Sequence, residues 1–289
     1  MQSLFIFIAI VLGILLPYGH EYTWVFRPNL MVMLFFSFLG VQFSRHMIRP
    51  NHFAILACNI SLPLLLYFVV DWVDHNAALA VFAVSAAPTA AAAPVLADFF
   101  KRDISYVTAS VLLTSPVIAF VLPLLLSLLI AIEGDASLLD ILYAILSLIF
   151  IPLFISALTK YALPSLADRL LKFKKVGFAL FLANIYIASA NARHFLESNG
   201  EGNWRAVGII AVAVGSVCLL QFGIGGWLGR PQYRIESGLA LGRKNTMFAL
   251  WVCLTFISPL VALGPMFYII FQNLYNTAQL LQEERRRSA

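Results

Sequence analysis

Ten long apolar runs, separated by short charged or turn-forming segments, occupy most of the 289-residue chain. Apolar residues make up 61% of the sequence and charged residues 11%, against about 45–50% and about 25% in an ordinary soluble domain. A membrane-spanning helix needs about 20 predominantly apolar residues. We therefore expect an all-α integral membrane protein with ten transmembrane helices and a single transmembrane domain, residues 1–289. The runs cover residues 3–18, 28–44, 53–70, 77–98, 104–131, 139–159, 176–195, 206–228, 236–257 and 260–281.

The cations alternate between the two sides of this predicted bundle. By the positive-inside rule, the side rich in Lys and Arg is cytoplasmic. The opposite side holds only Arg27, Arg193 and Arg205. We therefore expect a multi-pass protein of the cell (inner) membrane, surrounded by lipid, with both termini in the cytoplasm. The 14 cations of the cytoplasmic side are Arg45, Arg49, Lys101, Arg102, Lys160, Arg169, Lys172, Lys174, Lys175, Arg230, Arg234, Arg285, Arg286 and Arg287.

The chain also divides into two similar halves, residues 1–131 and 139–281. In each half the fourth run is interrupted and the fifth is rich in proline and small polar residues. Because five helices is an odd number, the halves must be inverted relative to each other. Paired interruptions in an inverted repeat are typical of secondary transporters, whose substrate site lies where the interrupted helices meet near the midplane.

The fourth run, residues 77–98, contains two prolines that a simple membrane helix would avoid. Pro88 and Pro94 each remove a backbone N–H and clash with the preceding turn. A break near Pro88-Thr89 would start a second half-helix inside the membrane, where its N-terminal dipole favours an anion. A proline kink packed against a neighbouring helix is the other interpretation.

The ninth run, residues 236–257, contains the adjacent cations Arg243 and Lys244, followed by Asn245 and Thr246. Each cation would cost about 2.5–3.5 kcal/mol at a helix centre facing lipid, so both must face protein or water. An unwound backbone makes this easier, and Gly242 permits unwinding. The pair could neutralise Asp98 and Asp103, or it could form a pocket for a carboxylate or sulfonate together with the fourth run. We favour the second interpretation. The candidate substrate-binding residues are Arg243, Lys244, Asn245, Thr246, Pro88 and Thr89.

Short motifs in order along the chain resemble the bile acid:sodium symporter family over essentially the whole length. The resemblance implies inverted five-helix repeats whose helices 4 and 9 are broken and cross. It also implies transport of a small organic anion by rocking a core domain against a panel domain. The motifs are Ala87-Pro88, Lys101-Arg102-Asp103, Pro123, Gly242, Asn245, Ser258-Pro259-Leu260 and Gln272-Asn273-Leu274.

The chain departs from this family at its sodium ligands. Sodium-coupled members carry an acid and an amide where this chain has Ala240 and Lys244, and sodium requires several oxygen donors. Sodium coupling at these positions is therefore not expected. The ammonium of Lys244 could stand in for the ion, which gives uniport or exchange, or it could titrate and support proton coupling. The family's other ligand positions fall at Ala93, Pro94, Val107 and Val111.

Other function classes have little support in the sequence. Cys58, Cys218 and Cys253 lie in apolar runs without metal-ligand spacing, and no phosphate loop or nucleophile–base pair is recognisable. We therefore expect no enzyme activity, cofactor, metal or nucleic-acid partner. A non-transporting membrane sensor or receptor on the same bundle is the alternative. Weaker cavity-lining candidates, for which packing is the favoured interpretation, are Gln42, Asn59, Thr108, Thr114, Asn184, Ser189, Asn191, Gln272, Asn273 and Asn276.

Overall fold

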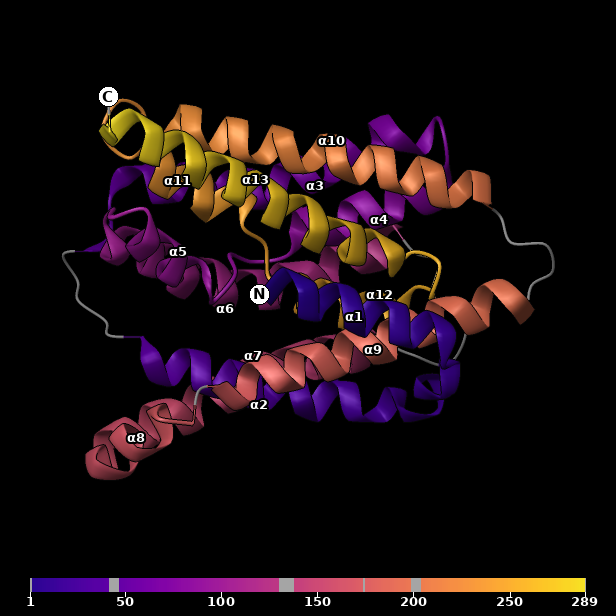
Figure 1. Ribbon diagram of the computed structural model, residues 1–289, viewed down its shortest axis with the longest axis horizontal. Coiled ribbons are helices and arrows are strands. Elements are labelled where there is room, and N and C mark those ends of the chain that lie inside the picture. The colour runs from indigo at the N-terminus through magenta and orange to yellow at the C-terminus, as the bar shows by residue number, and fades with distance from the viewer. Residues whose placement is uncertain (1, 42–46, 130–137, 174, 199–203, 289) are drawn as a thin grey trace. The chain divides into compact units, whose positions relative to one another are not determined.

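The computed structural model describes residues 2–41, 47–129, 138–173, 175–198 and 204–288 (Figure 1). Gln42, Arg45 and Lys174, which entered the predictions above, lie outside the described residues. Within these ranges the chain is helical, and its only β-type pairing is one isolated bridge. The elements are α1 (Gln2–Leu15), η1 (Pro17–Val25), α2 (Phe26–Gly40), α3 (Pro50–Asp71), α4 (His75–Ala86), α5 (Ala93–Phe99), α6 (Ile104–Leu129), α7 (Leu138–Ala162), α8 (Pro164–Leu171), α9 (Lys175–Ser198), α10 (Trp204–Leu228), α11 (Arg234–Gly242), α12 (Thr246–Phe256) and α13 (Leu263–Ser288).

Each apolar run corresponds to one helix, except the fourth and ninth, which correspond to two helices separated by a break. The fourth run forms α4 and α5, and the ninth forms α11 and α12. Two further short helices, η1 and α8, were not predicted. Each begins at a proline, which fits the first turn of a helix because its missing N–H has no helical partner there. Neither contains a long apolar run, so hydropathy alone gave no signal for them.

Five helical segments in the described part of the chain are long and apolar enough to cross a membrane. Helices α1, α4 and α12 are apolar but shorter. Large apolar side chains such as Leu128 on α6 and Val212 on α10 are exposed, as expected for helices surrounded by hydrocarbon. These features fit an all-helical membrane protein. The five segments are Pro17–Gly40, Pro50–Asp71, Ile104–Leu129, Leu138–Ala162 and Trp204–Leu228.

The chain divides into two compact units, and each unit is built from separated stretches of sequence. Unit 1 comprises residues 1–41, 116–204 and 250–262. Unit 2 comprises residues 42–115, 205–249 and 263–289. Each unit therefore takes part of its structure from either half of the chain.

In unit 1, α9 packs against α1 and α2, and α2 also packs against α7 (Figure 1). Polar side chains link these helices. Asn29 donates to Asn184 at 3.0 Å, and Asn191 donates to the Thr23 hydroxyl at 2.9 Å. Hydrogen bonds between membrane helices stabilise their association by about 0.6 kcal/mol each. These contacts agree with a packing role for Asn184 and Asn191.

Unit 2 is assembled around α4, whose residues from Ala77 to Ala86 are all buried. α4 packs against α3 and α13. The close approach to α13 depends on Gly264, where a Cβ atom would lie 2.7 Å from the Cβ of Ala80. α11 packs against α3 and α5, and it also approaches α10 closely at Gly225. Small residues thus allow the backbones of unit 2 to approach each other closely.

Candidate functional site

The first break separates α4 from α5 and follows from the local sequence. Ala87 has extended backbone angles, with φ −59° and ψ 140°, as the steric demand of the following Pro88 requires. Pro88 has no N–H to continue the helix. Pro94 lies in the first turn of α5, where a proline is tolerated. The two prolines therefore end one helix and open the next.

The second break separates α11 from α12. Arg243 is extended, with φ −86° and ψ 93°, and α12 begins at Thr246. The Asn245 side chain accepts a hydrogen bond from the N–H of Phe248 at 3.2 Å and so caps α12. Gly242 contributes here through packing, because a Cβ atom at this position would overlap the ring of Phe222. The glycine is required for this close contact.

The two breaks meet inside unit 2 in an antiparallel bridge between Thr89 and Lys244. The N–H of Ala90 donates to the carbonyl of Arg243, and the N–H of Asn245 donates to the carbonyl of Pro88, each at 2.8 Å. Unwound backbone in a membrane protein must find hydrogen-bond partners within the protein. Here each break supplies one N–H donor and one carbonyl acceptor to the other break.

Thr89 adds a side-chain connection to this bridge. Its hydroxyl donates to the carbonyl of Ala240 at 2.6 Å, and its N–H donates to the hydroxyl of Thr114 at 3.0 Å. Ala240 lies in the last turn of α11, where carbonyls have no helical N–H to bond. Thr89 therefore ties the first break to α11 and to α6.

Lys244 is buried, with 1% of its surface exposed, and its ammonium group lies among oxygen atoms of α3 and α4. Its Nζ donates to Oδ1 of Asn59 and, at 2.7 Å, to the carbonyl of Ser85. Its backbone N–H donates to the side-chain oxygen of Gln272 at 3.2 Å. Both acceptors of the ammonium are neutral, so the positive charge of Lys244 is solvated but not cancelled.

Arg243 is half-buried, and its Nη1 donates to Oδ1 of Asn273 at 2.7 Å. Its buried Nε atom has no hydrogen-bond partner among the described residues. In that part of the chain no carboxylate lies within ion-pair distance of Arg243 or Lys244. Asp103 instead accepts hydrogen bonds from the N–H groups of Ser105 and Tyr106 at the start of α6.

The structure brings all six predicted site residues to this crossing. Pro88, Thr89, Lys244 and Thr246 are buried, whereas Arg243 and Asn245 are partly exposed. Asn59, Gln272 and Asn273 were predicted only as weaker candidates, and Ser85 was not predicted. The sequence indicated these three amides only because each is a polar side chain within an apolar run. The carbonyl of Ser85 gives no sequence signal.

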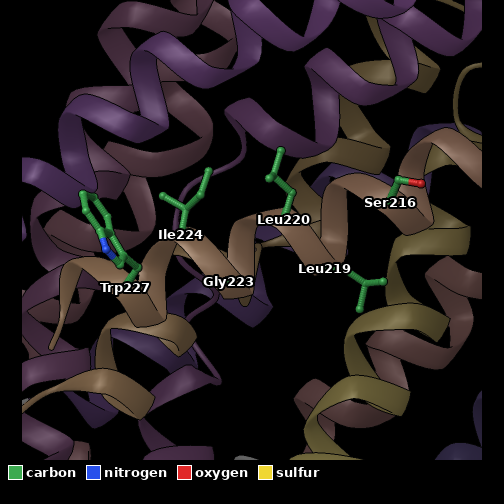
Figure 2. Close-up of a pocket in the computed structure, with 6 residues that line it drawn as sticks. All are labelled: Ser216, Leu219, Leu220, Gly223, Ile224 and Trp227. Atoms are coloured by element: carbon green, nitrogen blue, oxygen red, sulfur yellow. The ribbon is translucent and has the colours of Figure 1, made fainter. Parts of the chain in front are cut away.

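A surface hollow elsewhere on unit 2 lies along α10 (Figure 2). It is open and mostly apolar, and Leu219 and Trp227 are strongly exposed. It offers no charged group to an anion. Its lining residues are Ser216, Leu219, Leu220, Gly223, Ile224 and Trp227.

Thr89→Val is expected to destabilise the crossing. Valine keeps the shape of threonine but leaves the carbonyl of Ala240 without its side-chain donor, a loss of about 1–3 kcal/mol. The melting temperature in detergent should fall. Thr277→Val is the matched control because the exposed Thr277 hydroxyl bonds within its own helix, to the carbonyl of Asn273. Equal melting temperatures for the two variants would contradict a role for Thr89 in holding the breaks together.

No protein-family model matches the chain, and no curated protein matches it.

Proposed function

We propose that this protein is a secondary membrane transporter of the bile acid:sodium symporter type, which carries a small organic anion by alternating access. The observation that carries this proposal is the crossing itself. Two interrupted helices meet in one backbone bridge, and two cations without a carboxylate partner in the described part of the chain lie at that point. Interrupted helices at a crossing are typical of transporter binding sites.

A carboxylate or sulfonate suits the charge at this crossing. Arg243 can turn its guanidinium toward a ligand, since its Nε has no partner in the described part of the chain and its Nη1 contacts the neutral Asn273. A guanidinium binds planar anionic groups with two parallel hydrogen bonds. α12 begins at the same point, and its N-terminal dipole adds positive potential. We assign the substrate site to Arg243, Lys244, Asn245, Thr246, Pro88 and Thr89.

The ammonium of Lys244 takes the place of a coupling cation in this proposal. Its two contacts, an amide oxygen and a backbone carbonyl, are the kind of oxygen ligands that bind a metal cation. The positions that align with sodium ligands of the family hold buried Ala93, Ala240, Val107 and Val111, which offer no side-chain oxygen. The carrier then works without sodium, by uniport, exchange or proton coupling.

The division of the chain into two compact units supports alternating access, since carriers of this kind move one rigid unit against another. Each unit takes residues from both halves of the sequence, as two inverted five-helix repeats would require. We place the ten-span bundle in the cell membrane with both termini in the cytoplasm, on the charge asymmetry of its loops.

Replacing sodium with potassium is expected to leave organic-anion flux unchanged. The purified protein is reconstituted in liposomes, and uptake of radiolabelled monocarboxylates, sulfonates and bile salts is measured in sodium and in potassium buffer. The same liposomes with Arg243→Gln protein give the background. Uptake that requires sodium would contradict the substitution of Lys244 for the ion. Absence of any flux above background across the panel would contradict the carrier itself.

A further inference from the structure

The short helix α8 directly follows α7, a helix long and apolar enough to cross a membrane (Figure 1). Only Leu163 separates the two helices, with the non-helical backbone angles φ −137° and ψ 60°. The next residue, Pro164, disfavours a helical conformation at Leu163 and is suited to the first turn of α8. The chain therefore ends the long helix at one residue and begins a new helix at its end.

One side of α8 packs within unit 1, against α7 and α2. Ala167 is buried on this side. Leu171 approaches the end of α2, since a Cβ atom at Gly40 would lie 3.9 Å from its Cδ2. α8 is therefore held against two helices of its unit.

Lys160, in the last turn of α7, fixes the end of α2 in the same region. Its Nζ donates to the carbonyl of Phe38 at 2.9 Å and to the carbonyl of Val41. These carbonyls belong to the C-terminal end of α2, where a cation also complements the helix dipole. The charge of Lys160 is therefore used within the protein.

The other apolar side chains of this segment are uncovered. Leu163 is 52% exposed, Leu166 is 41% exposed, and Phe173, just after the helix, is 61% exposed. Residues three or four positions apart lie on the same side of a helix, so these three form one stripe together with Leu170. Tyr161, in the last turn of α7, is 92% exposed. Exposed apolar and aromatic side chains thus continue from the end of the long helix into α8.

Two exposed cations accompany this apolar stripe. Arg169 and Lys172 are three residues apart, so they lie together on one side of α8. In the described part of the chain no carboxylate lies within ion-pair distance of either cation, and this includes the neighbouring Asp168. In the sequence Lys174 and Lys175 follow directly. The segment therefore has an excess of positive charge next to exposed apolar side chains.

An apolar stripe accompanied by Lys and Arg is typical of a helix that lies in the membrane interface. There the apolar side chains enter the boundary of the acyl chains, and the cations extend to the headgroups. Because α8 begins one residue after a helix of membrane-spanning length, this interface is the surface that its uncovered side meets. Tyrosine is also enriched at this depth, which suits the exposed Tyr161.

We propose that α8 is an interfacial helix that binds anionic phospholipid through Arg169 and Lys172. The phosphate of a lipid headgroup accepts charge-assisted hydrogen bonds from both side chains. A surface of anionic lipid attracts them further, whereas a zwitterionic surface carries no net charge. The crossing lies in unit 2 and α8 in unit 1, so this proposal does not depend on the proposed transport.

Spin labels on two sides of α8 test its position. The full-length protein, with Cys58, Cys218 and Cys253 replaced by alanine, is reconstituted in liposomes and labelled at Leu166→Cys or at Asp168→Cys. The label at 166 should collide more often with oxygen, which concentrates in hydrocarbon, and the label at 168 with a water-soluble nickel complex. Equal access of the nickel complex to both labels would place α8 in water. A label at 166 shielded from both reagents would show that protein covers this side, either a second copy or another chain. Either result would overturn the proposal.

Lipid titration tests the class of lipid. The purified protein in detergent is titrated with phosphatidylglycerol or with zwitterionic phosphatidylcholine, and the rise in melting temperature gives the apparent affinity. Each Lys or Arg near an anionic surface strengthens binding about fivefold. Arg169→Gln combined with Lys172→Gln should therefore weaken phosphatidylglycerol binding about 25-fold and leave phosphatidylcholine binding unchanged.

Arg205→Gln combined with Arg230→Gln is the matched control. It removes the same number of exposed cations, at the two ends of α10, and should bind phosphatidylglycerol as the wild type does. An equal loss of affinity in this control would assign the effect to overall charge and refute a site on α8. Equal affinity of the wild type for the two lipids would refute the preference for anionic headgroups.

Discussion

Lys244→Met is expected to abolish anion transport while the protein remains folded. Methionine has a similar length but no charge, so the crossing loses the ammonium group that contacts Asn59 and Ser85. The Asn59 amide and the Ser85 carbonyl lose a donor, which costs about 1–3 kcal/mol per unsatisfied buried group. Release of a buried, uncancelled charge offsets much of this loss. Transport and melting temperature are measured on the same preparation.

Asn59→Asp tests the contribution of the Lys244 charge separately from that of its hydrogen bonds. An aspartate keeps the contact to Nζ but forms an ion pair that cancels the positive charge. The variant should fold at least as well as the wild type and yet lose anion transport. Lys172→Met, at an exposed lysine, is the control and should transport normally. Full activity in Lys244→Met or in Asn59→Asp would show that Lys244 only supports the structure.

Gly225→Val is expected to be the most destabilising of the single substitutions considered for unit 2. A Cβ atom at Gly225 would lie 2.5 Å from the backbone carbonyl of Ser237 and 3.0 Å from Cα of Gly238. Backbone atoms cannot move aside as a flexible side chain can, so α10 and α11 must separate. Overpacking of this kind typically costs about 1–3 kcal/mol or more. The melting temperature in detergent, with protein yield beside it, measures the effect.

Gly223→Val provides a matched control on the same helix. Gly223 lines the open hollow on α10, and a Cβ atom there would meet nothing within 4 Å (Figure 2). Both substitutions carry the same intrinsic cost of a β-branched residue in a helix. The difference between them therefore reports the helix contact alone. If both variants melt at the same temperature, α11 does not lie against α10 at Gly225.

The sequence predicted the positions of both helix breaks because their causes are local. Pro88 cannot continue a helix, and two adjacent cations cannot both face lipid. The partners of those cations could not be predicted in the same way. Asn59 lies 185 residues from Lys244, and the other acceptor is a backbone carbonyl that every residue possesses. Gly242 was assigned to unwinding, whereas its position is explained by contact with Phe222.

Long-range packing also explains what hydropathy missed. Glu236 was counted within an apolar run, and nothing in its neighbourhood along the chain indicates that the N–H of Asp103, 133 residues away, donates a hydrogen bond to it. Breaks in the helices also affect how many segments qualify as membrane-spanning. In the described part of the chain five segments are long and apolar enough to cross a membrane, whereas the broken helices α4 and α12 are each too short, and the ten-span arrangement stays a prediction.

The bridge between Thr89 and Lys244 is made by backbone atoms, whereas the chemistry of the crossing depends on its side chains. Its two hydrogen bonds join backbone atoms only, between Ala90 and Arg243 and between Asn245 and Pro88. These two bonds require N–H groups at positions 90 and 245 and carbonyls at positions 88 and 243, so any residue except proline can supply the donors. Side chains at the crossing can therefore be substituted while the backbone bridge between the two breaks persists.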